Sequence, residues 1–220
     1  MRSISVTLAE YGWAWLVCSR RLFVWKYIQS NKSKIESFEL QLPASDLLHK
    51  ADLISLMPPQ SSTTSTPGVI AVSPEGIIRY WPNVAHSGHS IETVVTDLQG
   101  QECYSLTSID PYGFILGTTT SSLLHIVIKN NIATCRTLKV PQGVLAGFGH
   151  KVSSLIFGAL PTSQLFESKQ LVKVIQGSSE KDSEINIFVL AGLFLQKWVM
   201  LDINTEKVAY DNNIIYYNII

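Results

Sequence analysis

The residues best suited to metal chemistry are two histidines in a polar stretch, AHSGHSI, at residues 85–91. His86 and His89 have a spacing that two metal-bound imidazoles can use, and the nearest further ligands are Glu92 and Asp97. Protein zinc sites are completed by additional His or Cys ligands at regular spacing, and none follows here. We therefore predict a solvated loop at this position and no metal site.

The cysteines and the common catalytic motifs also indicate little chemistry. Cys18, Cys103 and Cys135 are odd in number and form no C-x-x-C pair, which argues against a disulfide framework and is typical of a reducing compartment. The sequence contains no G-x-S-x-G, Walker loop or G-x-G-x-x-G. We predict that the chain is not an enzyme and uses no cofactor and no small-molecule substrate.

The equal numbers of basic and acidic residues indicate whether nucleic acid is an expected partner. Lys and Arg number 17, as do Asp and Glu, and there is no basic block. Direct binding to nucleic acid needs a basic patch, so we do not expect it.

Residues 141–161, PQGVLAGFGHKVSSLIFGALP, carry the clearest functional pattern. On a helix the apolar side chains form one stripe, and Lys151 is the only formal charge. Gly147, Gly149 and Gly158 each cost a helix about 1 kcal/mol relative to Ala, so the helix should be marginal in water.

Such a segment folds when an apolar acceptor covers its stripe. A charge-poor amphipathic helix can use acyl chains exposed in highly curved membranes, as lipid-packing sensors do. The alternative is a surface helix or loop docked on its own domain. The candidate membrane-binding residues are Val144, Leu145, Phe148, Val152, Leu155, Ile156, Phe157 and Leu160.

Four similar units surround this segment and must position it. Each has an apolar strand, a tight turn and a second strand, a pattern that predicts a β-hairpin. The units are residues 12–27, 69–82, 112–128 and 186–200. Their spacing of roughly 45 to 70 residues is typical of propeller blades with loop insertions, and a β-sandwich is the alternative.

The apolar side chains of these units predict packing rather than ligand binding. Trp25, Trp81 and Trp198 fall near the ends of second strands, where we expect them in the core between blades. Residues 187–195 are too short to span a bilayer and predict a buried strand or a pair of strands. The short apolar run at 13–18 has no clear cleavage site, so we do not expect a signal peptide.

The fold prediction is an all-β, partial β-propeller with one amphipathic helical or disordered loop insertion at residues 141–161. About four blades fill residues 1–200, which predicts either a small propeller or part of a longer protein.

Several sequence blocks together resemble a known family. They are GWAWLV at 12–17, EGIIRYWP at 75–82, GFILGTTTSSLLHI at 113–126 and LAGFGHKVSSL at 145–155. In order and approximate spacing they are similar to the N-terminal β-propeller of the nucleoporin 133 family. The resemblance implies that residues 1–200 are an incomplete N-terminal β-propeller, so that the chain is a fragment of that propeller. The sequence after Trp198 follows the family pattern poorly, and we expect residues 201–220 to be a divergent tail.

The resemblance implies a function. The family is a structural subunit of the Y-shaped outer-ring complex of the nuclear pore, and a propeller loop in it carries a lipid-packing sensor similar to residues 141–161. Expected partners are other outer-ring nucleoporins and, peripherally, the nuclear envelope membrane. The expected location is the nucleus, at the nuclear pore complex, and the expected role is support of nucleocytoplasmic transport of mRNA and protein. The alternative is a generic protein-interaction β-propeller with no membrane role.

Overall fold

The computed structural model shows a β-sheet protein. The residues that the structure describes form four sheets of four antiparallel strands each, and within each sheet the strands are neighbours in sequence order. The residues that the structure describes are 4–9, 11–28, 35–59, 65–96, 98, 100–109, 113–120, 122–129, 132–138, 171–177, 185–191, 194–202 and 207–210.

The strands have the following bounds. The first sheet contains β1 (Ile4–Leu8), β2 (Trp13–Cys18), β3 (Arg21–Lys26) and β4 (Ser37–Gln41). The second contains β5 (Ile54–Met57), β6 (Gly68–Val72), β7 (Ile77–Trp81) and β8 (Ile91–Val94). The third contains β9 (Cys103–Ser108), β10 (Phe114–Thr118), β11 (Leu123–Lys129) and β12 (Ile132–Leu138). The fourth contains β13 (Leu171–Gly177), β14 (Ile185–Ala191), β15 (Phe194–Asp202) and β16 (Lys207–Tyr210).

The predicted hairpins coincide with the two central strands of each sheet. They are β2–β3, β6–β7, β10–β11 and β14–β15, all paired antiparallel. Trp25, Trp81 and Trp198 lie in the third strands, β3, β7 and β15. The apolar run at 187–195 is a pair of strands, since β14 ends at Ala191 and β15 begins at Phe194.

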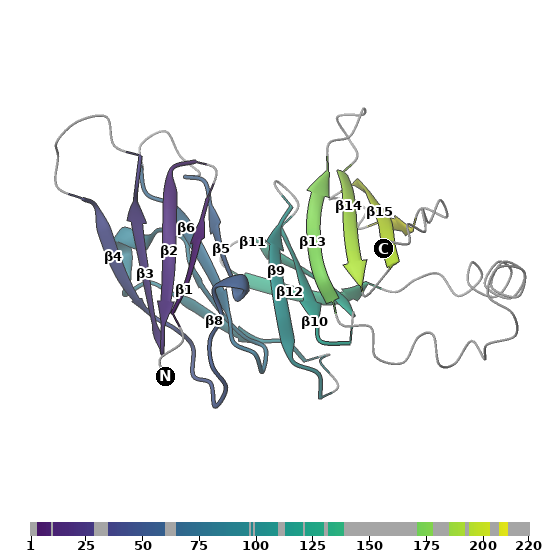
Figure 1. Ribbon diagram of the computed structural model, residues 1–220, viewed down its shortest axis with the longest axis horizontal. Coiled ribbons are helices and arrows are strands. Elements are labelled where there is room, and N and C mark those ends of the chain that lie inside the picture. The colour runs from purple at the N-terminus through teal and green to yellow at the C-terminus, as the bar shows by residue number, and fades with distance from the viewer. Residues whose placement is uncertain are drawn as a thin grey trace, which may run out of the picture.

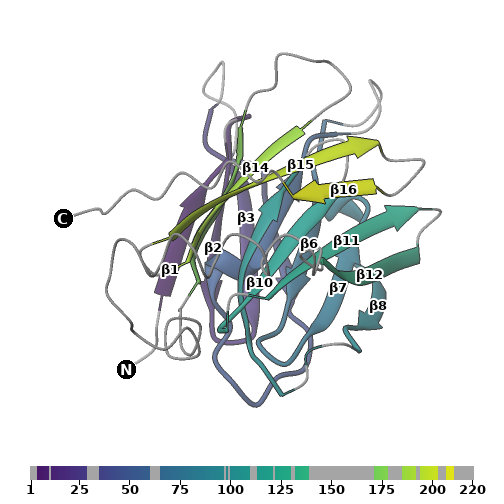
Figure 2. The same cartoon turned by 90° about the vertical axis from the view of Figure 1, so that its right-hand side faces the viewer.

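The sheets follow one another along the long axis of the molecule, from the first sheet at one end to the fourth at the other (Figure 1). The view from the fourth-sheet end looks along this stack (Figure 2). The first strand of the third sheet, β9, contacts the first strands of the second and fourth sheets, β5 and β13. The last strands of the second and third sheets, β8 and β12, also contact each other. This is a radial arrangement of blades, and it confirms the predicted all-β, partial-propeller fold.

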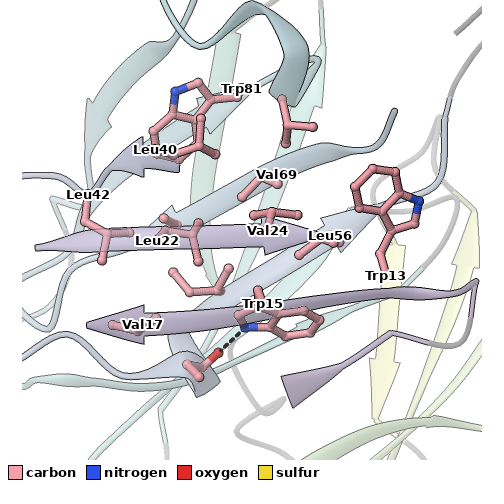
Figure 3. Packing of buried hydrophobic residues seen from close by; sticks show 14 residues of the cluster. Trp13, Trp15, Val17, Leu22, Val24, Leu40, Leu42, Leu56, Val69 and Trp81 are labelled. Atoms are coloured by element: carbon pink, nitrogen blue, oxygen red, sulfur yellow. Dashed lines mark hydrogen bonds between the residues drawn. The ribbon is translucent and has the colours of Figure 1, made fainter. Parts of the chain in front are cut away.

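Three apolar clusters hold consecutive sheets together. Side chains alternate between the faces of a strand, so an inner sheet needs apolar residues on both faces. The cluster between the first two sheets includes three tryptophans spread around aliphatic side chains (Figure 3): Trp13, Trp15 and Trp81. The second cluster joins the second and third sheets, with Ile70, Tyr80, Phe114 and Ile126 among its members. The third joins the third and fourth sheets through residues such as Ile115, Leu123, Val174 and Ile187.

Two further predictions concern the ends of the chain and the loop. The boundary at residue 200 stays a prediction, and β16 follows it, paired with β15. Residues 141–161 lie outside the described residues, so their predicted helix or loop is untested. Among the described helices, none is long and apolar enough to cross a membrane.

Candidate functional site

The His86 and His89 stretch lies at the surface of the second sheet. The short 3-10 helix η2 (Val84–His86) ends at the first histidine, and both side chains are exposed. The carboxylate of Glu92 is already engaged by Arg79, and Asp97 lies outside the described residues. No group of three or more His, Cys, Asp or Glu in the described part of the chain is arranged to hold a metal ion.

The cysteines differ in environment. Cys103 is fully buried in the cluster between the second and third sheets, and Cys18 and Cys135 are partly buried. Burial raises the pKa of the Cys103 thiol to about 12. A thiol needs to ionise to act as a nucleophile or metal ligand, so Cys103 serves as an apolar core residue.

The amphipathic segment falls in the connection between the third and fourth sheets. β12 ends at Leu138 and β13 begins at Leu171, and the segment lies between them in sequence. All of the candidate membrane-binding residues are therefore outside the described residues: Val144, Leu145, Phe148, Val152, Leu155, Ile156, Phe157 and Leu160. Their role stays a prediction.

Arg79 in β7 joins the first two sheets. Its Nη1 donates hydrogen bonds to the carbonyl oxygens of Gln41 (2.7 Å) and Leu42 (3.2 Å), where β4 ends. Its Nε donates to Glu92 Oε2 in β8 (2.8 Å). Because the side chain of Arg79 is only 22% exposed, water screens these charge-assisted bonds less than those of a surface pair.

Glu75, in the turn between β6 and β7, binds the connection between the first and second sheets, which runs from the end of β4 at Gln41 to the start of β5 at Ile54. Its carboxylate accepts hydrogen bonds from Ser45 Oγ (2.8 and 3.0 Å) and from the backbone amides of Asp46 and Leu47 (both 3.0 Å). Gly76 follows with a φ of +90°, a conformation that side chains disfavour. The turn therefore presents Glu75 to the connection.

Titration of Glu75 reflects these contacts. Partial burial alone would raise its pKa, but hydrogen bonds from the Ser45 side chain and from backbone amides outweigh that effect. The pKa of Glu75 therefore lies below its ordinary value of 4.5. The ionised carboxylate is the form that fastens the connection.

Two further contacts hold the same connection. His49 is buried, and its Nε2 lies 3.0 Å from the carbonyl oxygen of Pro43. Burial lowers the pKa of His49, although that hydrogen bond opposes the change. Trp15 Nε1 donates to the carbonyl oxygen of Ala51 (3.1 Å), at the start of the 3-10 helix η1 (Ala51–Leu53), as the dashed line in Figure 3 marks.

These contacts fix geometry rather than perform chemistry. Arg79 and Glu75 join segments that are brought together by the packing of one sheet on the next, and His49 joins two residues of the same connection. The sequence predicted a tight turn within residues 69–82 but not the partner of the Glu75 carboxylate. A glutamate in a Pro-x-Gly turn is common at any surface, so only the folded arrangement reveals this role.

Four-stranded antiparallel sheets packed radially define the chain as a β-propeller protein. A family model described as "Nup133 N terminal like" matches residues 3–220. The chain belongs to this nucleoporin family, which confirms the resemblance found in the sequence.

Two relatives show the extent of the similarity. Nuclear pore complex protein Nup133 of Drosophila melanogaster is 32% identical over an alignment 231 positions long, which covers 96% of this chain and 19% of that protein. The Homo sapiens protein of the same name is 36% identical over 215 residues, covering 94% of this chain and 18% of that protein. The chain thus spans about a fifth of the length of these relatives.

A solved structure supports the fold independently. The β-propeller domain of Vanderwaltozyma polyspora Nup133 superposes with a TM-score of 0.60 and 16% sequence identity. The match covers 94% of this chain and 48% of that domain. Membership in a family of structural rather than catalytic proteins agrees with the prediction that the chain is not an enzyme.

Proposed function

We propose that this chain is part of the structural scaffold of the nuclear pore, at the nuclear envelope. The observation that carries the proposal is its membership in the Nup133 N-terminal family, because the similar full-length proteins are named as nuclear pore complex proteins. Its partners are other outer-ring nucleoporins. The scaffold supports nucleocytoplasmic transport, including mRNA export, without binding nucleic acid or a small-molecule substrate itself.

We also propose that residues 141–161 contact curved membrane. The segment has one apolar stripe and a single formal charge, Lys151, which belongs to the opposite side of the helix. Burying each large apolar side chain contributes about 1.5–3 kcal/mol, which offsets the glycine cost of forming the helix. With little charge to attract anionic lipid, binding depends on the gaps between acyl chains that curvature opens.

The location of the segment supports this role. In sequence it lies between β12, the last strand of the third sheet, and β13, the first strand of the fourth, and the pairing described for these sheets involves strands outside it. The described members of the three apolar clusters come from strands and short connections within residues 9–138 and 174–189. A connection of this kind can change its own conformation while the sheets keep theirs.

Flotation of the whole chain with neutral-lipid vesicles of graded diameter tests the membrane role. We expect binding to small vesicles, and Phe148→Asp and Leu155→Asp should each abolish it. Ser154→Asp is the matched control, because it adds the same charge to the polar side and should reduce binding far less. Circular dichroism on the same samples should show helix content rising on small vesicles.

The alternative, a protein-interaction propeller without a membrane role, predicts different results. Then the wild-type chain would not float with vesicles of any diameter. Loss of folding in Phe148→Asp and Leu155→Asp would identify a helix docked on the sheets. A scaffold role is tested separately, by recovery of nucleoporins with the tagged chain from nuclear envelopes.

A further inference from the structure

Three exposed apolar side chains lie around the turn between β6 and β7. Leu47 is 43% exposed, Leu48 68% and Val94 58%. The amide of Leu47 donates to the Glu75 carboxylate in this turn (3.0 Å), and Val94 at the end of β8 is opposite Ile77, the first residue of β7. Residues from two different parts of the chain therefore meet beside one turn, and we call the three of them the turn patch.

Hydrogen bonds fix the backbone that carries the turn patch. On one side of the turn, Ser45 Oγ donates to the Glu75 carboxylate (2.8 Å) and accepts from the amide of Leu47 (3.1 Å). On the other side, the amide of Val95 donates to the carbonyl oxygen of Gly76 (2.9 Å). Exposed apolar side chains on a fixed backbone lose little entropy when they are covered, so they are suited to an interaction site.

The turn patch lies on the side of the stack where the sheets are connected to one another. The connection from β4 to β5 passes below the first sheet in Figure 1. β9 begins on the same side, since the amide of Cys103 donates to the carbonyl oxygen of Pro74 in the turn (2.7 Å). The strands of the third sheet alternate in direction, so β12 ends on the side where β9 begins. The chain that leads to residues 141–161 therefore leaves β12, at Leu138, on the side of the turn patch.

Charged side chains on this side indicate what kind of surface the patch can meet. In the described connections and turns they are exposed, and more of them are acidic than basic: Arg20, Asp46, Lys50, Asp52, Glu75 and Glu102. An excess of acidic groups disfavours contact with an anionic surface. Residues 141–161 have a single formal charge, Lys151, and also need an apolar acceptor. The patch and the segment thus favour the same kind of partner, a neutral lipid bilayer.

We propose that the turn patch inserts into the same neutral membrane as residues 141–161 and gives the propeller a second, preformed lipid contact. The inference rests on the proposed membrane contact of that segment. Once the segment is bound, the patch meets the bilayer at a high effective concentration, so a small apolar contact is sufficient. Two contacts on one side of the stack fix which side of the propeller faces the lipid. Leu48 should contribute most, because its side chain has the largest exposed fraction to bury.

Flotation of the whole chain with small phosphatidylcholine vesicles tests the second contact. Leu48→Ser adds no charge and should weaken binding about tenfold. Ile132→Ser is the matched control, because Ile132 is 62% exposed at the start of β12, on the opposite side of the stack, and should not change binding. Equal binding of Leu48→Ser and wild type would overturn the inference, and a loss in Phe148→Asp would still support the proposed function. Absence of binding by the wild type would overturn both.

A fluorescent label shows whether the patch itself enters the lipid. In a background with Cys18→Ser and Cys135→Ser, where Cys103 is buried, an environment-sensitive fluorophore is attached to Leu48→Cys or to Ile132→Cys. Emission from Leu48→Cys should shift to the blue on small vesicles and be quenched by lipids brominated in their acyl chains, whereas Ile132→Cys should show neither change. Unshifted emission from a vesicle-bound Leu48→Cys chain would show that the patch stays in water and would overturn the inference.

A protein partner for the turn patch gives a different result. Leu48→Ser would then bind vesicles like the wild type but recover fewer nucleoporins from nuclear envelopes. That outcome would replace the lipid contact by a protein contact at the same side chains.

Discussion

Trp81 and Trp25 occupy equivalent places in adjacent sheets but have different surroundings. Each lies at or near the end of a third strand, opposite a small or β-branched residue of the second strand. Trp81 is 2% exposed because the first sheet packs over it, whereas Trp25 lies on the face of the first sheet that points away from the second sheet and is only partly buried. The local sequence is alike, and the neighbouring sheet makes the difference.

The comparison separates two contributions to the fold. Strand and hairpin formation repeats from sheet to sheet and depends on local pattern. The stabilisation gained from each hairpin depends on how many faces another sheet covers. Equivalent substitutions in a covered and an uncovered sheet should therefore have unequal effects.

The largest expected contrast is between Trp81→Ala and Trp25→Ala. Removing a fully buried aromatic side chain costs about 3–5 kcal/mol in the free energy of unfolding, and a partly buried one about 1 kcal/mol or less. Urea unfolding followed by circular dichroism at low protein concentration measures both. Equal losses would mean that the face of the first sheet that carries Trp25 is covered under those conditions.

A smaller contrast is expected between two arginines. Arg79→Met removes the hydrogen bonds to Gln41 and Leu42, which join the first two sheets, and the bond to Glu92 within the second sheet, and it should cost about 2 kcal/mol. Arg21 pairs with Glu39 on the first sheet at 3.2 Å, with side chains 62% and 52% exposed, so Arg21→Met should cost about 0.5 kcal/mol or less. The same urea titrations compare the two variants. A larger loss of unfolding free energy in Arg21→Met than in Arg79→Met would contradict the role of Arg79 in joining the first two sheets.

The smallest expected effect depends on pH. The folded-state pKa of Glu75 lies below 4.5, so its contribution to stability is present above about pH 4.5 and is lost as the pH falls through the folded value. Glu75→Gln should lower the free energy of unfolding by about 1 kcal/mol or less at neutral pH, because the side chain is mostly exposed. The variant should also lose less stability than the wild type as the pH falls below about 4.5.

Thermal melts from pH 3 to 7 measure this slope, with Glu39→Gln as the control. The lowered pKa of His49 also makes acid destabilising, since the unfolded chain binds that proton more tightly. Its contribution begins as the pH falls below about 6.5, so it is distinguishable from that of Glu75. An unchanged acid slope in Glu75→Gln would show that the connection is held without the carboxylate.

The central strands could be predicted from the sequence because their apolar runs flank tight turns. The pairs β6–β7 and β14–β15 were found in this way. Edge strands such as β8 and β4 were not assigned individually, since they are short and mix polar with apolar residues. Their place depends on pairing with a strand already formed.

The contacts around Glu75 and Arg79 could not be predicted. The partners of Glu75 at residues 45–47 and the two carbonyl groups bound by Arg79 lie 28 to 38 residues away in sequence and become neighbours only when two sheets pack. The amphipathic segment shows the opposite case, because its periodicity is evident in the sequence. What its apolar stripe contacts is a property of the surroundings, which the vesicle experiment addresses.

Because Cys103 is buried, the rate at which its thiol is labelled can measure how often the second and third sheets separate. Cys103 lies in the cluster between the second and third sheets, and its pKa is raised to about 12. While those sheets are packed together, a thiol-labelling reagent cannot reach the side chain, and the thiol is not ionised. Labelling at this position therefore reports each opening of that seam. The partly buried Cys18 and Cys135 supply the reference rate within the same molecule.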